Sequence, residues 1–157
     1  MKVSSRLAAW AAAVALWLLS GPAVGLEPAH LVADFERGLV LLETQGPRCL
    51  LIDTYFASTA RQRAQGLMFV ESLGEFEGMY FGYASAVELN MWMKNTLVPL
   101  DMLFVREDGT VGRIARDTQP LSTDRIASGG AVVGVLELNA GFARRWRVTP
   151  GTGFWLL

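Results

Sequence analysis

Most of this chain consists of short apolar runs that are separated by turn-forming residues. Residues 39–42 and 49–52 are two such runs, and Gln45-Gly46-Pro47 lies between them, which is the pattern of a β-hairpin. Glu107-Asp108-Gly109 predicts a second tight turn. The other apolar runs are too short for typical helices and predict further strands, at residues 79–81, 89–93, 100–105, 111–115, 132–138 and 154–157.

Two segments carry helix signals instead. Thr59 and Gln62 have the spacing of a capping box, in which each side chain accepts a hydrogen bond from the other residue's free backbone amide, and Gly66 stands where a helix would end. Residues 139–146 predict a second short helix, with arginines near its C-terminus where they oppose the helix dipole. The pattern as a whole predicts a mostly β (α+β) fold, a compact barrel-like domain of short strands with two small helices.

The N-terminal segment has a pattern of its own. Two basic residues precede thirteen uninterrupted apolar residues, 7–19, and Ala23-Val24-Gly25 places small residues where a signal peptidase cleaves. Thirteen residues are fewer than the roughly 20 that span a bilayer. We therefore predict a cleaved signal peptide at 1–25 and a single β-rich domain at 26–157. The expected location is periplasmic or secreted, with no stable membrane span after cleavage.

Composition and charge narrow the classes of function. Hydrophobic residues make up 52% of the chain, enough for a packed core. Removing Lys2 and Arg6 with the signal leaves 12 basic residues against 15 acidic ones, a net charge of −3 without a basic stripe, which argues against nucleic-acid binding. Cys49 is the only cysteine and His30 the only histidine. Neither a Ser-His-Asp hydrolase nor a zinc site is predicted, and we expect no cofactor or metal.

Three charged residues interrupt apolar strand patterns. Lys94 shares a face with Trp92 if that segment is extended, whereas Asp101 and Glu137 alternate with aliphatic residues. An unpaired buried charge costs several kcal/mol, so such residues have partners or face a cleft. One interpretation is that the three charges cap strand ends and pair with each other or with arginines. The other is that they line one polar pocket, together with Trp92, Asn95 and Thr96.

Arginine and methionine supply two further signals. Arg63, on the first predicted helix, either caps carbonyl groups or clamps an anionic ligand through its two-pronged guanidinium. Five methionines fall in the middle third of the chain, and thioethers are ligands that Cu(I) accepts. Methionine is more often a flexible filler of cores. The five methionines in this part of the chain are Met68, Met79, Met91, Met93 and Met102.

Several ordered blocks of residues resemble a known family, the small exported or archaeal proteins called domain of unknown function 192. The most specific block is Trp92-Met93-Lys94-Asn95-Thr96, followed by 99–104. The resemblance runs from about residue 50 to the C-terminus. Other matching blocks are 59–63, 65–68, 78–81, 135–141 and 150–151.

The resemblance implies a compact, β-rich, barrel-like domain, and it brings no settled activity. This chain departs from the family pattern in two places. Where relatives usually carry acidic residues after the helix cap it has Arg61 and Gln62, and where many carry an arginine after the Gly-Leu-Met block it has Val70.

Three functions remain open at this point. The first is a periplasmic binding or accessory domain, whose partner is a small-molecule ligand or another envelope protein. The second is a small enzyme with Lys94 as general base or Schiff-base amine, tuned by the two carboxylates. The third is Cu(I) binding by methionines. The expected binding residues are Arg63, Trp92, Lys94, Asn95, Thr96, Asp101 and Glu137.

Overall fold

The computed structural model describes residues 29–44, 46 and 48–157. The predicted signal peptide, 1–25, lies outside the described residues. The described chain forms three short helices and seven strands. In chain order these are α1 (Ala29–Asp34), β1 (Glu36–Glu43), β2 (Cys49–Ala57), α2 (Ala60–Gln65), β3 (Glu77–Met91), β4 (Leu100–Val105), β5 (Val111–Ala115), β6 (Ile126–Asn139), α3 (Phe142–Arg145) and β7 (Gly153–Leu156).

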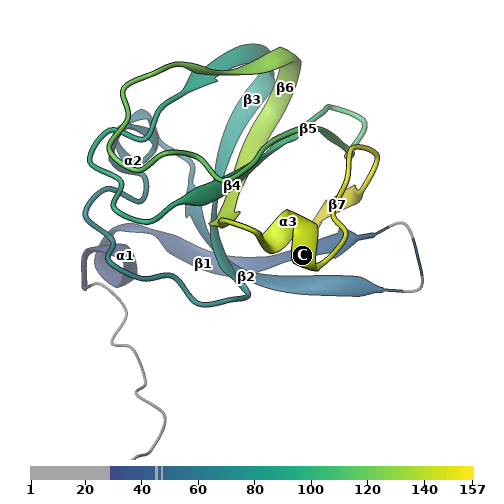
Figure 1. Cartoon of the computed structure of the whole chain (residues 1–157), viewed down its shortest axis with the longest axis horizontal. Coiled ribbons are helices and arrows are strands. Elements are labelled where there is room, and N and C mark those ends of the chain that lie inside the picture. The colour runs from purple at the N-terminus through teal and green to yellow at the C-terminus, as the bar shows by residue number, and fades with distance from the viewer. Residues whose placement is uncertain (1–28, 45, 47) are drawn as a thin grey trace, which may run out of the picture.

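All seven strands belong to one curled sheet, in the order β5-β4-β6-β3-β2-β1-β7 (Figure 1). Every neighbouring pair is antiparallel except β2 and β3, which run parallel because α2 and a long turn connect them. The sheet curls until its outer strands meet: Val111 N donates to Thr152 O at 2.8 Å, and Phe154 N donates to Gly109 O at 2.7 Å. The predicted mostly β, barrel-like fold is confirmed.

The predicted β-hairpin and capping box are both present. β1 and β2 pair from Glu36↔Phe56 to Glu43↔Cys49. At α2, Gln62 N donates to Thr59 Oγ1 at 3.2 Å and Thr59 N donates to Gln62 Oε1 at 2.9 Å. These bonds satisfy two amides that a helix of six residues leaves free at its start.

Other boundaries differ from the expectation. α1 forms in a segment where the sequence showed no periodicity. β3 and β6 are far longer than the predicted strands, with 15 and 14 residues. α3 is shorter than the predicted helix, since Asn139 still pairs with Leu100 as the last residue of β6.

The central strands have packed cores on both faces. All six residues of β4 are buried. Leu103 and Val105 face the interior of the curled sheet, with residues of β1, β2 and β7, whereas Met102 and Phe104 face a second core beneath α1, the turn after α2 and the loop after β3. A strand buried on both faces reads as a continuous apolar run, so its sequence does not reveal which face a given residue takes.

The segment that carries the most specific sequence block is a turn and not a strand. β3 ends at Met91, and Thr96 N donates to Met93 O at 3.0 Å. Asn95 closes the turn with φ of 57°, a left-handed conformation that asparagine tolerates better than most residues. The expectation that Lys94 and Trp92 share one face of an extended strand is therefore wrong, because the chain reverses between Met93 and Thr96.

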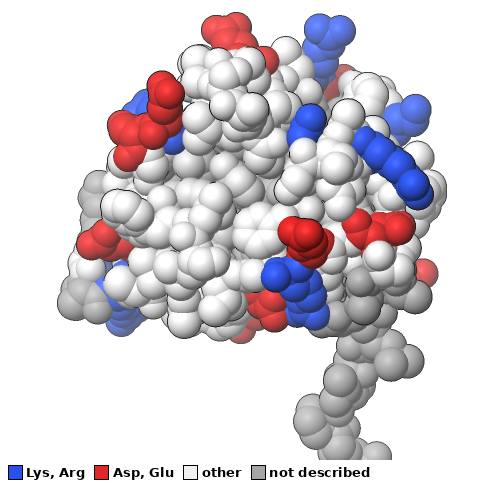
Figure 2. Space-filling view, turned by 180° about the vertical axis from the view of Figure 1, so that it is seen from behind, with Lys and Arg blue, Asp and Glu red and all other residues white. Residues whose placement is uncertain are grey.

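The surface of the molecule mixes both signs of charge. Figure 2 shows acidic and basic side chains interspersed over one face, with uncharged surface between them. Within the part of the chain that the structure describes, no helix is both long and apolar enough to cross a membrane.

Candidate functional site

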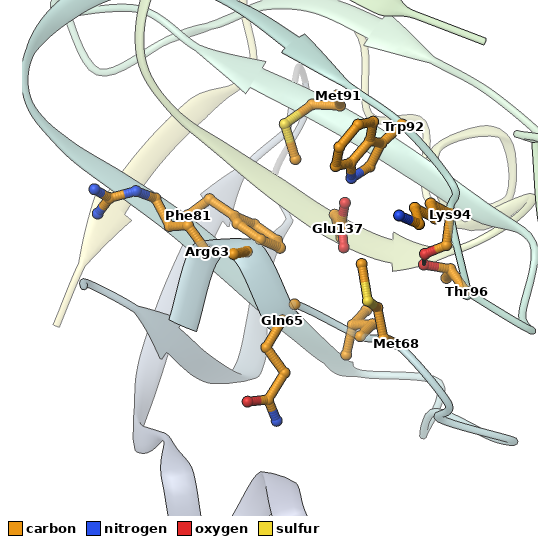
Figure 3. Close-up of a pocket in the computed structure, with 12 residues that line it drawn as sticks. Arg63, Gln65, Met68, Phe81, Met91, Trp92, Lys94, Thr96 and Glu137 are labelled. Carbon is orange, nitrogen blue, oxygen red and sulfur yellow. Dashed lines mark hydrogen bonds between the residues drawn. The ribbon is translucent and has the colours of Figure 1, made fainter. Parts of the chain in front are cut away.

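A small pocket opens where α2, the end of β3 and the turn after it meet the middle of the sheet (Figure 3). Its volume is about 30 Å³, and since one water requires roughly 10–15 Å³, it holds about two waters. The lining residues are 63–68 on α2 and the following turn, Phe81 and Met91 on β3, Trp92, Lys94 and Thr96 in the loop, and Glu137 on β6.

Glu137 lies at the base of this pocket. Its neighbours across the sheet are Met79 on β3 and Met102 on β4, and only 4% of the residue is exposed. Within residues 29–44, 46 and 48–157, no group donates a hydrogen bond to its carboxyl or forms an ion pair with it. Burial disfavours the charged form and raises the pKa of Glu137 to about 8. At neutral pH the carboxyl is therefore protonated.

Trp92 and Lys94 form the rim of the pocket. The Lys94 Nζ lies 5.7 Å from the centre of the Trp92 ring, within the range of a cation–π contact. In Figure 3 the ammonium group points toward the space in front of the Glu137 carboxyl. Both rim side chains are exposed. The pocket thus has an uncharged acid at its base and a cation at its mouth.

Thr96 and Asn95 have different roles in the same turn. Thr96 is buried and lines the pocket. Asn95 does not line it, but joins its two sides: Phe69 N donates to Asn95 O at 2.9 Å, and the Asn95 amide donates to Met68 Sδ at 3.7 Å. Asn95 therefore positions the walls of the pocket.

Arg63 lines the pocket with its stem while its guanidinium is used elsewhere. One nitrogen donates to Ser58 O at 2.7 Å and to Gly82 O at 3.1 Å, and the group stacks over the Tyr83 ring at 4.7 Å. Figure 3 shows the guanidinium directed away from Glu137. Of the two predicted roles, the structure shows the capping of carbonyl groups.

Asp101 does not belong to the pocket, which corrects the predicted cluster of Lys94, Asp101 and Glu137. Asp101 pairs with Leu138 across the sheet and faces the opposite side from Glu137. It is fully buried, and its two oxygens accept hydrogen bonds from Asp117 N and Ala143 N, each at 2.9 Å. Because Ala143 is in the first turn of α3, the Asp101 carboxylate holds the start of that helix.

The methionines divide into two groups. Met79, Met93 and Met102 are completely buried core residues. Met68 and Met91 line the pocket on either side of Glu137. Neither histidine nor cysteine is among the lining residues, and in the described ranges no group of three or more His, Cys, Asp and Glu residues is placed to hold a metal ion.

Sequence reasoning missed part of the pocket wall. Gln65, Gly66 and Phe81 line it, and none of them was a predicted binding residue. Gly66 has φ of 49°, and a Cβ there would lie 3.0 Å from the Phe81 ring, so only glycine lets the end of α2 approach β3 this closely. All three residues lie in the blocks 65–68 and 78–81 that carry the family resemblance, and those blocks were the available signal.

Comparison with known proteins relates these residues to a family. The family model DUF192, described as "Uncharacterized ACR", matches residues 41–154. A crystal structure from Sinorhizobium meliloti, described as a "putative transcription regulator", is 38% identical, with a TM-score of 0.76 over 78% of this chain and 95% of that one. A protein of unknown function from Novosphingobium aromaticivorans is 31% identical, with a TM-score of 0.76 over 84% and 94%. No curated protein matches the chain.

Proposed function

This chain belongs to the DUF192 family, and we propose that it is a periplasmic ligand-binding domain whose recognition groups are Glu137, Lys94 and Trp92. The location rests on the signal-peptide pattern of residues 1–25. The ligand site rests on the pocket between α2 and the loop after β3.

One observation carries the proposal: a buried carboxyl has no protein partner and opens into a cavity. Buried polar groups are almost always hydrogen-bonded, and leaving one unsatisfied costs about 1–3 kcal/mol. Glu137 is 4% exposed and has no donor or acceptor among the described residues. A ligand group or water in the pocket supplies the missing hydrogen bonds. This is the arrangement of a binding site, in which apolar walls surround a few polar groups.

Binding accounts for the site better than lysine catalysis does. An amine works as a base or Schiff-base nucleophile near neutral pH when burial or a neighbouring cation favours its neutral form. Lys94 is exposed, and Asp101, one of the carboxylates expected to tune it, lies on the other face of the sheet. The pocket holds no pair of titratable side chains in hydrogen-bond contact.

The charge of the chain does not favour gene regulation. The description of the Sinorhizobium meliloti protein applies to that protein. This chain carries a net charge of −3 once the signal is removed, and DNA contact relies on a concentration of basic side chains.

Copper binding is a second candidate, favoured by the two thioethers that line the same pocket. Met68 and Met91 flank Glu137, and Trp92 adds an aromatic ring at the rim. The Lys94 ammonium opposes a cation there, which places this candidate second. Competition for Cu(I) with a chromogenic chelator tests it, because Met68→Leu and Met91→Leu should each weaken binding at least tenfold. Equal competition by wild type and both variants removes it.

Ligand screening tests the main proposal. A set of small anionic, cationic and neutral compounds is added to the ¹⁵N-labelled protein, and the backbone amides of Gly66, Lys94 and Thr96 are followed by NMR. At least one compound should shift these signals in the wild type and not in Glu137→Ala. The matched control is Glu107→Ala, because Glu107 is an exposed residue of the remote β4–β5 turn. If no compound shifts the pocket signals, the proposal is wrong.

A further inference from the structure

The charges in the pocket indicate which sign of charge its ligand carries. The charged residues that line it are Arg63, Lys94 and Glu137, and the residues opposite Glu137 on the two adjacent strands are uncharged methionines. The Arg63 guanidinium is bound to carbonyl groups and directed away from Glu137, so Lys94 is the cation at the mouth, whereas burial keeps Glu137 protonated at neutral pH. The pocket therefore presents positive charge without a compensating anion.

Lys94 and Glu137 face each other without touching. Among the described residues they form neither a hydrogen bond nor an ion pair, although both line the same pocket and Figure 3 shows the ammonium directed at the space in front of the carboxyl. The space between them accepts a group that bridges two donors. The protonated carboxyl donates one hydrogen bond through its O–H, and the ammonium donates up to three.

We infer that the group bound in this pocket is a carboxylate, held between the Glu137 carboxyl and the Lys94 ammonium. The inference rests on the proposed binding function and adds the chemical class of the ligand. A carboxylate has two oxygens, one for each donor. A protonated ligand amine has no acceptor for these donors and is repelled by the ammonium of Lys94.

The size and walls of the pocket define the rest of the ligand. A volume of about 30 Å³ holds about two waters, which is close to the three heavy atoms of one carboxylate group. The side chains of Met68, Met91 and Trp92 surround the mouth. An alkyl chain attached to the carboxylate would pack against these apolar surfaces. The ligand class is a monocarboxylate with a short aliphatic tail.

The pH dependence of binding separates a carboxylate from an amine. A carboxylate ligand needs the proton on Glu137, so its affinity is constant below the pKa of about 8 and falls about tenfold per pH unit above it. An amine ligand needs the ionised carboxyl, so its affinity rises with pH until Glu137 has lost its proton. The two classes therefore change in opposite directions.

The experiment compares three probes of similar size. Propionate, propionamide and propylammonium are titrated into the full-chain protein at pH 6.5 and pH 9.5, and dissociation constants are measured from the NMR shifts of Gly66, Lys94 and Thr96. Propionate should bind best at pH 6.5 and at least tenfold more weakly at pH 9.5. Glu137→Gln should bind it with no pH dependence, and Lys94→Met should bind it about tenfold more weakly. Glu107→Gln, in the exposed β4–β5 turn, serves as the control and should match wild type.

The other possible results distinguish failure of the carboxylate inference from failure of the proposed binding function. Tighter binding of propylammonium, or of propionamide, overturns the carboxylate inference and leaves the binding function standing. Propionate binding that is unchanged between the two pH values also overturns the inference, because it shows that the proton of Glu137 takes no part. If no probe, and no compound of the wider screen, shifts the pocket signals, the binding function itself has failed.

Discussion

Asp101 and Glu137 lie on opposite faces of the sheet, although β4 and β6 place them diagonally next to each other. Asp101 pairs with Leu138, and Glu137 pairs with Met102. Because paired residues share a face and consecutive residues alternate, the two carboxyl groups point away from each other. One accepts two backbone hydrogen bonds and supports α3, and the other has no partner in the described protein and faces a pocket. We therefore expect Asp101 to be needed for stability and Glu137 to be needed for ligand binding.

Replacing Asp101 should destabilise the protein strongly. Asp101→Ala leaves the buried amide of Ala143 and the partly buried amide of Asp117 without acceptors, at about 1–3 kcal/mol for a fully buried one. We expect the free energy of unfolding to fall by about 2–5 kcal/mol in urea denaturation, and Asp101→Asn to lose less because it keeps one acceptor oxygen. Asp124→Ala, at an exposed position, is the control. A loss below about 1 kcal/mol for Asp101→Ala would show that these bonds do not hold α3.

Glu137 should make the wild type less stable as pH rises. Its pKa is about 8 in the folded state and about 4.5 in the unfolded state, so between these values the unfolded chain binds fewer protons. The contribution of this group to the free energy of unfolding is therefore highest below about pH 4.5. It falls as the pH rises to about 8 and is constant above that pH. The total is several kcal/mol, since one pKa unit corresponds to about 1.4 kcal/mol.

Glu137→Gln provides the comparison, because glutamine has a similar shape and does not titrate. The difference in free energy of unfolding between wild type and Glu137→Gln should increase by several kcal/mol in favour of the variant from pH 5 to pH 9. Urea denaturation at the two pH values measures it, and other titrating groups cancel in the difference. Parallel pH profiles for the two proteins would mean that Glu137 is ionised in the folded state.

Gly66→Ala should destabilise the end of α2. Gly66 has φ of 49° and ψ of −141°, a conformation that costs a residue with a Cβ about 1–3 kcal/mol, and the alanine Cβ would lie 3.0 Å from the Phe81 ring. We expect a loss of about 2–3 kcal/mol, measured as a lower Tm. Gly74→Ala is the matched control, because Gly74 has no positive φ and its added Cβ would lie 3.3 Å from the Glu77 side chain. Equal Tm values for the two variants would contradict this account of the pocket wall.

Replacing Arg63 should lower stability, whereas replacing Lys94 should lower ligand affinity. Arg63→Leu removes two hydrogen bonds to carbonyl groups and the stacking on Tyr83, so we expect a loss of about 1–3 kcal/mol in stability with little change in ligand affinity. Lys94→Met should change stability by less than about 0.5 kcal/mol because the residue is exposed. Urea denaturation and the propionate titration measure both variants. The reverse pattern would make Arg63 the ligand-binding cation.

Local signals in the sequence predicted local structure well. The hairpin of β1 and β2 and the capping box of Thr59 and Gln62 each depend on residues close together in the chain, and both are present. Glu137 was predicted as a site residue because a charge stands in an apolar strand, and it lines the pocket with Lys94, Trp92 and Thr96.

The incorrect predictions concern features that depend on tertiary packing. The face taken by Asp101 depends on the pairing of β4 with β6, and a strand buried on both sides carries no alternation that would reveal it. The turn at Asn95 depends on a single left-handed residue that bonds to Phe69, which is distant in sequence. The apolar run 49–52 predicts a buried, inert thiol at Cys49, but the residue is exposed because its side chain takes an outward position of β2.

The two ends of the described chain meet in the sheet, where Leu41 of β1 pairs with Trp155 of β7. A nascent chain that lacks residues 153–156 leaves the outer edge of β1 without hydrogen-bonding partners, and such an edge invites pairing with other chains. Closure of the sheet therefore requires β7. Removal of these four residues should therefore make the protein prone to associate with other chains through β1.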